Sequence, residues 1–361
     1  MRIAEIVAEP LTLHHIPEHQ ASFTTYKTIT NILVRITTDE GVTGLGEGAL
    51  IPQHLGEDQS TAVGLVNEKF RSVLIGLDPF DIRHAHKLMR RIVAEGRGAK
   101  CAIDFALHDI AAQAMGVPLY KFLGGQVLES YTTATGVGYN TPDEMVKEVR
   151  KKIAAGYTSF EVKMSGNATA DLERCLVLAR EIDPEIHLIL DPNEGWTVTE
   201  TIDVGRRLAG FSNRIYFEQP VPKENVSGMA HARRFMPVPI IAHEPITSPA
   251  YAYEIIRAEA ADIINVTPAR LGSLLASRQV IEICEAAGLD YRVDTPIVSK
   301  VGETAVAHLG SACQHVLAAV STHLDVEGGP ELSGGMMVEN GHVSLTSEPG
   351  LGIKLVGSTA S

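Results

Sequence analysis

The sequence lacks the features that mark membrane and nucleic-acid-binding proteins. It contains no apolar run long enough to span a bilayer, and its first residues, MRIAEIVAEP, lack the apolar core of a signal peptide. Acidic residues outnumber basic ones by 44 to 31, which gives a net charge of −13, and no basic tract stands out that would neutralise phosphates. We therefore expect a cytoplasmic protein with neither nucleic-acid nor membrane partners.

Two further absences disfavour a zinc site and an open, doubly wound sheet. No CxxC pair occurs, and the four cysteines lie far apart, mostly within helical patterns: Cys101, Cys175, Cys284 and Cys313. This spacing predicts reduced, buried thiols and disfavours a zinc site. No glycine-rich phosphate turn follows an early strand, so a doubly wound open sheet is the less favoured of two α/β architectures.

The first third of the chain has the pattern of an α+β unit. With 361 residues, of which 45% are hydrophobic and 21% charged, the chain is globular in composition and too long for one small core. Two β-rich runs flank the turn TTDEGVTG, and helical patterns follow at roughly 60–75 and 80–93. A third helix, AKCAIDFALHDIAAQAMG, ends at Gly116 with Pro118 beyond it. We expect an α+β domain with lid loops over residues 1–125.

From about residue 130, short β-rich runs alternate with amphipathic helical stretches. The runs are YTTATGVG, SFEVKMS, HLILDPN, RIYFEQP, PIIAHEP, DIINVTP, DYRVDTP and VLAAVSTHLD. Alternation at this pitch predicts βα units around a parallel sheet, and eight evenly spaced runs are what a barrel needs. We expect the barrel over residues 126–325, and a C-terminal segment, 326–361, that packs back on the first domain.

A polar residue stands where the apolar stretch of each barrel run ends. From the second run to the eighth these are Lys163, Asp191, Glu218, His243 with Glu244, Thr267, Asp294, and His323 with Asp325. In a parallel barrel the carboxyl ends of the strands converge on one mouth, which holds the active site. Asp191, Glu218 and Glu244, on three successive strands, are therefore expected to meet there.

Three clustered carboxylates favour a metal site. A single acid after a strand is more often a helix cap or a solvated loop residue. Three on consecutive strands would repel one another and resist burial unless a divalent cation bound them. A site made only of oxygen ligands favours Mg²⁺, with Mn²⁺ as a possible substitute.

The ordered segments resemble the enolase superfamily, in its mandelate racemase and muconate lactonizing enzyme branch. TNILVRITTDEGVTGLGEG and AIDFALHDIAAQAMGVPLYKFLGG look like the capping domain of that branch. GYTSFEVKMSG, LDPNEGWT, YFEQPVP, IIAHEP and VSKVGETAVAHL look like its barrel segments, in order. No single motif is diagnostic, but the ordered set is specific and covers nearly the whole chain.

The resemblance implies a fold, a metal site and a reaction. The fold is a modified TIM barrel, (β/α)₇β, under an α+β N-terminal capping domain, in a protein that forms homo-oligomers. Asp191, Glu218 and Glu244 would hold Mg²⁺, and the α-proton of a small carboxylate substrate would be abstracted to give an enediolate. Lys163 matches the usual base, and we expect burial and the neighbouring cation to lower its pKa.

Two positions depart from the pattern of the branch near the metal ligands. Glu161 replaces the first lysine of a common Lys-x-Lys, and with a period of two it faces the same side as Lys163. It either pairs with Lys163 and raises its pKa or binds a cationic group of the substrate. His243 replaces a common aspartate before Glu244, and it either contacts a metal ligand or faces the substrate.

A third departure bears on the reaction. Thr267 falls where the branch commonly has a second lysine, and Arg270 falls at the later basic position. Threonine cannot act as a base near pH 7, and racemisation needs a base on each face of the substrate. We therefore favour β-elimination, including dehydration, or cycloisomerisation. Racemisation or epimerisation of an amino or hydroxy acid, with Asp294 or His323 as the second base, is the alternative. A family member that only binds a carboxylate ligand and a metal-dependent aldolase are rivals.

Four further residues are candidates for substrate binding. Lys300, after strand seven, either meets a second substrate carboxylate or stays solvated, and Asp325 would meet a substrate ammonium group. Residues 14–27 are expected to form a lid from which Tyr26 reaches the substrate, and His323 lines the mouth from strand eight.

Overall fold

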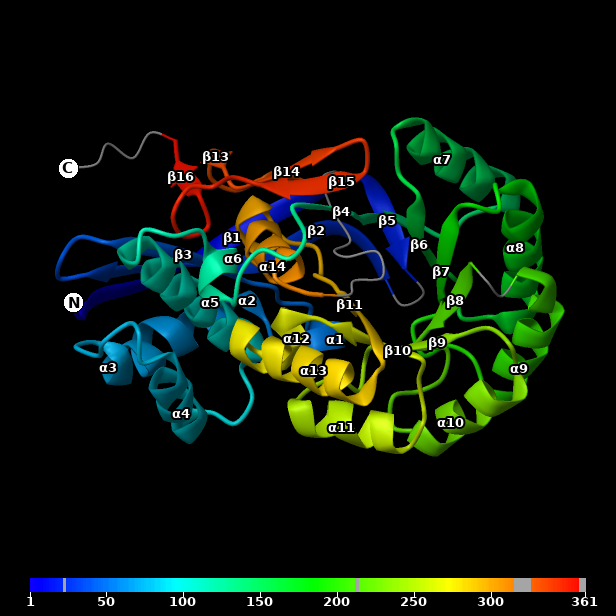
Figure 1. Ribbon diagram of the computed structural model, residues 1–361, viewed down its shortest axis with the longest axis horizontal. Helices are drawn as coiled ribbons and strands as arrows, with labels where there is room; N and C mark the ends of the chain where they lie inside the picture. Colours follow the sequence, from blue (N-terminus) through cyan, green and yellow to red (C-terminus); the bar gives the residue numbers. More distant parts are fainter. Residues whose placement is uncertain (22–23, 212–213, 315–325, 357–361) are drawn as a thin grey trace.

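The computed structural model describes residues 1–21, 24–211, 214–314 and 326–356 (Figure 1). An N-terminal part made of an antiparallel sheet and helices lies beside a larger part in which strands alternate with helices. One hydrophobic core fills the N-terminal part, and a second extends through the larger part. None of the helices within the described ranges combines the length and apolar character needed to cross a membrane.

The N-terminal sheet has the strand order β12-β1-β2-β3, with every neighbouring pair antiparallel. Its strands are β1 (Ile3–Ala21), β2 (Thr24–Thr38), β3 (Thr43–Gly48) and β12 (Val326–Gly328). Helix α5 (Arg97–Ala114) crosses β3 so closely that a Cβ atom on Gly46 would lie 1.9 Å from the carbonyl oxygen of Ala102. Glycine is therefore required there for the helix to pack on the sheet.

The described parts of residues 14–27, which we expect to form a lid, are extended strands. Residues 14–21 continue β1 and residues 24–27 continue β2, with His19 opposite Tyr26 and Gln20 opposite Thr25. The threonine-rich stretch TTYKTIT favours these strands, because β-branched and aromatic residues favour extended pairing.

Short helices complete the N-terminal part. They are α1 (Pro52–Leu55), α2 (Gln59–Gly64), a π-helical turn (Leu65–Phe70), α3 (Arg71–Leu74), α4 (Ile82–Ile92) and α6 (Leu119–Phe122). The elements from α2 to α3 match the helix predicted near 60–75, and α4 matches the one predicted near 80–93. All four cysteines are buried as free thiols, as the sequence predicts.

Seven parallel strands run in chain order through the second part. They are β5 (Ala134–Val137), β6 (Ser159–Lys163), β7 (His187–Asp191), β8 (Ile215–Glu218), β9 (Ile240–Ala242), β10 (Ile263–Val266) and β11 (Asp290–Val293). These are the predicted barrel runs, and the order confirms the α/β barrel with a capping domain. The eighth run, at 316–325, lies outside the described residues.

Helices follow the strands and cover the outside of the sheet (Figure 1). They are α7 (Pro142–Ala154), α8 (Ala168–Glu181), α9 (Val198–Arg207), a 3₁₀ turn (Ala209–Phe211), α10 (Val226–Phe235), α11 (Pro249–Arg257), α12 (Pro268–Leu271), α13 (Leu274–Ala287) and α14 (Lys300–Ser311). Several begin at a side chain that accepts a backbone N–H of the first turn: Asn167, Thr197, Asn225, Ser248, Ser273 and Ser299.

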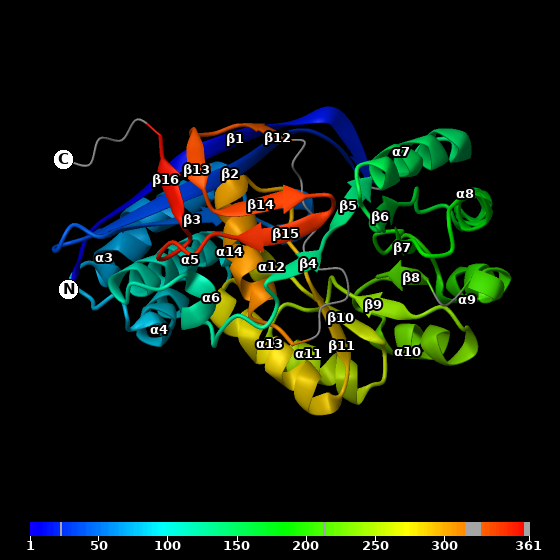
Figure 2. The same ribbon diagram turned by 45° about the horizontal axis from the view of Figure 1, so that its top comes forward.

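The C-terminal segment pairs with both parts, as Figure 2 shows. β12 lies against β1, and β15 (His342–Leu345) pairs with β14 (Met336–Glu339) and with β4 (Ser130–Thr132). β13 (Leu332–Gly334) pairs with β16 (Ile353–Leu355).

Two buried carboxylates tie these parts together. Glu47 of β3 accepts hydrogen bonds from the backbone N–H of Ser299 and of Gly302, at the start of α14. Asp109 of α5 accepts bonds from the backbone N–H of Leu45 and of Leu351. The capping domain is thus bonded to the helix that follows β11 and to the C-terminal segment.

Asp109 is expected to make stability depend on pH. Burial raises the pKa of its carboxyl to about 6, above the value of about 3.8 in an unfolded chain. The folded state therefore binds the proton more tightly, and this contribution is present below pH 3.8 and lost as pH rises through 6. Relative to Asp109→Asn, the wild type should gain about 2 kcal/mol of unfolding free energy between pH 7 and pH 4. Urea unfolding at both pH values measures this, and a pH-independent difference would refute it.

Candidate active site

The strand ends bring the predicted residues to one edge of the parallel sheet. Lys163 is the last residue of β6, Asp191 of β7 and Glu218 of β8, and Lys163 is paired in register with Asp191. Glu244 comes two residues after the end of β9. Asp191, Glu218 and Glu244 are fully buried, so their charges are held away from bulk water.

Lys163 is held between two carboxylates. Its Nζ atom lies 2.5 Å from Oδ2 of Asp191 and 2.7 Å from Oε1 of Glu161. Of the two alternatives for Glu161, the structure shows the pairing with Lys163. Burial acts to lower the pKa of Lys163, but Asp191 and Glu161 outweigh it and hold the pKa well above the usual value. This is the direction expected from pairing with Glu161, whereas the lowered pKa that we expected depends on a bound cation and stays a prediction.

Asp191 has the properties of a ligand to a cation. The backbone N–H and the side-chain amide of Asn193 each donate to it at 2.8 Å, which fixes its orientation. Burial raises the pKa of Asp191 to about 7, and Lys163 offsets only part of that shift. The charges of Glu218 and Glu244 raise it further, which shows that the three carboxylates lie close enough to repel one another.

Glu218 is surrounded by donors. Nη1 of Arg292 lies 2.7 Å from its Oε2 atom, and Nδ2 of Asn265 donates to Oε1 at 2.9 Å. Nδ1 of His243 lies 2.8 Å from Oε1 and 3.8 Å from Oε2 of Glu244. His243 therefore contacts the predicted metal ligands, which is one of the two roles that we considered for it.

The residues present fit a hard divalent cation. Ligand oxygens of Glu161, Asp191 and Glu218 all lie within 4.8 Å of one another, and the charge of Glu244 acts on Asp191 from the next strand. Glu161 is engaged by two cations, Lys163 and Arg292. Asp191 and Glu218 are likewise paired, with Lys163 and Arg292. The oxygen ligands suit Mg²⁺, and the set of Asp191, Glu218 and Glu244 stays a prediction.

Arg292 is the main functional candidate that the sequence analysis missed. It lies on β11 with no exposed surface, and it contacts Glu161 at 3.0 Å, Glu218 at 2.7 Å and Asp294 at 3.5 Å. A charged residue inside the run DYRVD, on the same face as Asp294, was the available signal. On this strand the sequence analysis singled out only Asp294, the residue just after its end, whereas Arg292 balances the charge of the carboxylates from within the sheet.

Replacing Arg292 by methionine is expected to destabilise the fold by about 3 to 5 kcal/mol, because removing one partner leaves buried carboxylates without compensation. Urea unfolding measures the loss. The matched control is Arg257→Met, since Arg257 is exposed on α11 and contacts only Glu254 among the described ion pairs; it should change stability little. Equal stability of the two variants would contradict the charge-balancing role.

Thr267 and its neighbours form the side of the site across the sheet from Lys163. Three strands, β7, β8 and β9, separate β6 from β10, which ends just before Thr267. Oγ1 of Thr267 lies 3.0 Å from Nε2 of His243 and donates to Oδ1 of Asn265 at 3.3 Å. Asp294 is buried and accepts from Asn265 at 3.0 Å. Thr267 thus belongs to a polar network with His243, Asn265 and Asp294.

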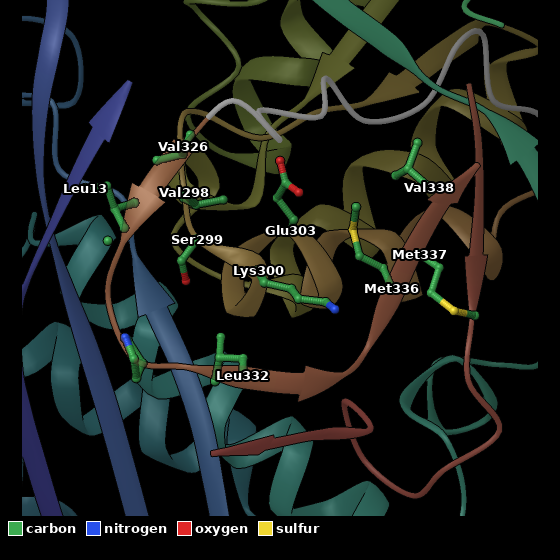
Figure 3. A pocket seen from close by; sticks show the side chains of 12 residues that line it. Leu13, Val298, Ser299, Lys300, Glu303, Val326, Leu332, Met336, Met337 and Val338 are labelled. Atoms are coloured by element: carbon green, nitrogen blue, oxygen red, sulfur yellow. The ribbon is translucent and has the colours of Figure 1, made fainter. Parts of the chain in front are cut away.

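None of the four candidates for substrate binding is shown in contact with the carboxylate cluster. Lys300 begins α14 and, with Glu303, lines a separate cavity of 500 Å³ beside Met336 and Met337 of β14 (Figure 3). The side chain of Tyr26, and the whole of His323 and Asp325, lie outside the described residues. The structure therefore does not show what these three side chains contact.

Comparisons with known proteins show the family of the chain. Residues 2–124 match the family described as mandelate racemase / muconate lactonizing enzyme, N-terminal domain, and residues 144–358 match the one described as enolase C-terminal domain-like. Muconate cycloisomerase 1 of Rhodococcus opacus is 31% identical over 97% of this chain and 96% of its own. An L-Ala-D/L-Glu epimerase of Clostridium acetobutylicum is 27% identical over 98% of this chain and 99% of its own.

Solved structures of proteins from this family have the same fold. The substrate-liganded L-Ala-D/L-Glu epimerase of Bacillus subtilis superposes with a TM-score of 0.93 at 25% identity, covering 98% of this chain and 99% of that one. The dipeptide epimerase of Enterococcus faecalis, complexed with Mg and the dipeptide L-Leu-L-Tyr, has a TM-score of 0.93 at 26% identity, covering 98% and 100%. The chain belongs to the mandelate racemase and muconate lactonizing enzyme branch of the enolase superfamily, and it is an enzyme of that superfamily.

Proposed function

We propose that the enzyme uses Mg²⁺ and Lys163 to take the α-proton from a small carboxylate substrate, and that the reaction proceeds by β-elimination or cycloisomerisation. One observation carries the proposal: Lys163 contacts a buried carboxylate cluster, whereas the side chain across the sheet from it, Thr267, cannot act as a base near pH 7. The complex of the Enterococcus faecalis epimerase with Mg supports the choice of metal.

The residues of this chain have separate tasks in the proposed reaction. Asp191, Glu218 and Glu244 would hold the metal, which would supply positive charge to stabilise the charge that develops on the substrate carboxylate and to oppose protonation of Lys163. Nζ of Lys163 receives the α-proton, and the C–H electron pair moves toward the substrate carboxylate. Asp191 and Glu161 orient Nζ through the contacts already described. Burial of the cluster excludes water from the developing charge.

Epimerisation is the second candidate, because several of the similar proteins are epimerases. It needs a proton donor on the face opposite Lys163. Asp294 already accepts from Asn265 and lies 3.5 Å from Arg292, which disfavours it as that donor. The position of His323 is not described.

Deuterium exchange tests the proposal. The Mg²⁺-loaded enzyme is incubated in D₂O with a library of amino, hydroxy and sugar acids, dipeptides and dicarboxylates, and α-deuterium is followed by NMR. We expect exchange or turnover with one face labelled. Label on both faces, with interconversion of stereoisomers, would show epimerisation instead. Binding of library acids with neither exchange nor turnover would support a carboxylate-binding protein without catalysis.

A further inference from the structure

Residues 51–56, which we call the cover turn, lie beside the candidate active site. The turn contains the short helix α1 and belongs to the capping domain, but its residue Leu55 packs on an apolar cluster that includes Ala269 of α12 and Val298 of the segment after β11. Leu55 also lines a cavity of 120 Å³ together with Glu244, one of the predicted metal ligands. The cover turn therefore forms part of the barrel mouth on the side of Glu244.

The segment that carries the cover turn is bonded at both ends to the capping sheet. Upstream, the backbone N–H of Leu50 donates to Oδ1 of Asn31 on β2 at 3.1 Å, and Nδ2 of Asn31 donates to the carbonyl oxygen of Ile297 at 3.0 Å. Downstream, Nε2 of Gln59 donates to the carbonyl oxygen of Asn31 at 2.6 Å. These bonds fix the two ends of the segment, so the position of its middle depends on further contacts.

Glu57 makes such a contact, because it joins the downstream end of the cover turn to α5. Its Oε1 atom accepts the backbone N–H of Gly98 at 2.8 Å, and Oε2 accepts that of Ala99 at 3.3 Å. Both N–H groups belong to the first turn of α5, whose N-cap residue, Gly96, has no side chain to accept them. Glu57 is 8% exposed. A buried carboxylate from a distant segment thus caps α5, where the helix dipole also favours negative charge.

The start of α5 is a well-fixed attachment point. Nζ of Lys100 donates to the carbonyl oxygens of Val93 at 2.7 Å and of Ala94 at 2.9 Å, which holds the turn that leads into the helix. A Cβ atom on Gly98 would lie 2.7 Å from the carbonyl oxygen of Ala49, so the helix packs directly on the chain that enters the cover turn. A segment bonded to the start of α5 is therefore held in one position.

We propose that Glu57 is a positioning residue of the active site, which holds the cover turn at the barrel mouth by bonding it to the start of α5. Without these two charge-assisted hydrogen bonds the segment stays attached at Leu50 and Gln59, but the cover turn spends more of its time away from the mouth. The consequence for catalysis rests on the proposed function, because it assumes that the substrate binds at the mouth beside Glu244.

Hydrogen exchange of the Mg²⁺-saturated protein tests the attachment directly. Glu57→Gln keeps the size of the side chain but removes its charge and leaves one acceptor oxygen in place of two. We expect two amides to exchange about tenfold faster than in the wild type: that of Gly98, and that of Leu55, which donates to the carbonyl oxygen of Ile51. Amides of α8, in the barrel, should exchange at the wild-type rate.

The kinetics separate positioning from a loss of folded enzyme. With whichever acid the wild type labels in D₂O, Glu57→Gln should raise KM by about fivefold and leave kcat nearly unchanged, because a site that is covered for only part of the time has a lower apparent affinity. A merely structural defect would lower kcat in proportion to the folded enzyme that is lost and leave KM unchanged. The matched control is Glu68→Gln, which removes an exposed carboxylate of the capping domain and should change neither hydrogen exchange nor KM.

Two results would overturn the inference: wild-type exchange rates at Leu55 and Gly98 in Glu57→Gln, or a lowered kcat with an unchanged KM. The outcomes also distinguish this inference from the proposed function. Faster exchange of the cover turn in Glu57→Gln, in a protein that labels no acid of the library, would defeat the reaction and leave the attachment standing. α-Proton labelling that requires Lys163, with hydrogen exchange unaffected by Glu57→Gln, would defeat the attachment and leave the reaction standing.

Discussion

Replacing Lys163 by alanine is expected to lower the rate of α-proton exchange in D₂O by about 10³-fold, the contribution typical of a positioned general base. The physical reason is that Nζ of Lys163 is the proton acceptor held against Asp191 and Glu161 at the edge of the buried cluster. Exchange is measured by NMR with whichever acid of the library the wild-type enzyme labels.

Two controls distinguish loss of the base from loss of a surface charge and from loss of the metal site. Lys147→Ala removes an exposed lysine from α7 and should exchange at the wild-type rate. The Lys163→Ala variant should still bind Mg²⁺ at least as tightly as the wild type, because it loses an ammonium group that competes for the charge of Asp191. Exchange that persists within about tenfold of the wild-type rate would remove Lys163 from the role of base.

Replacing Glu244 by glutamine is expected to weaken Mg²⁺ binding by about 10²-fold or more, because the site loses a charged oxygen ligand in a buried position. Isothermal titration calorimetry with Mg²⁺ gives the affinity, and thermal unfolding without metal shows whether the variant is folded.

The Mg²⁺ affinity of Glu161→Gln is the comparison that identifies the third ligand. Glu161 is also buried, and its oxygens lie within 4.8 Å of those of Asp191 and Glu218, but it is paired with Lys163 and Arg292. Our assignment predicts that its replacement changes Mg²⁺ affinity by less than about tenfold. A larger loss for Glu161→Gln than for Glu244→Gln would mean that Glu161 is the third ligand.

The sequence predicted the strand-end residues well because parallel strands impose a simple rule. The carboxyl ends of such strands meet at one edge, so Lys163, Asp191 and Glu218 could be placed together from the periodicity of their runs alone. The turn at TTDEGVTG and the helix that ends near Gly116 were predictable for a similar reason, since they depend on local residue preferences.

Charge balance could not be predicted in the same way. The contacts of Arg292 with Glu161 and Glu218 join residues 131 and 74 positions apart, so they depend on where β11 lies relative to β6 and β8. The pKa of Lys163 likewise depends on how closely Asp191 and Glu161 approach its Nζ atom, which the sequence does not give. The hydrogen bonds that Glu47 accepts at the start of α14 also join residues far apart in the sequence.

The most direct measurement is the anomalous diffraction of a crystal soaked in Mn²⁺, which replaces Mg²⁺ at oxygen sites and gives a signal that Mg²⁺ lacks. We predict one strong peak bonded to the carboxylates of positions 191, 218 and 244, with the amine of position 163 facing it across the mouth. A peak elsewhere in the molecule, or no peak in a crystal that retains these carboxylates in place, would contradict the account.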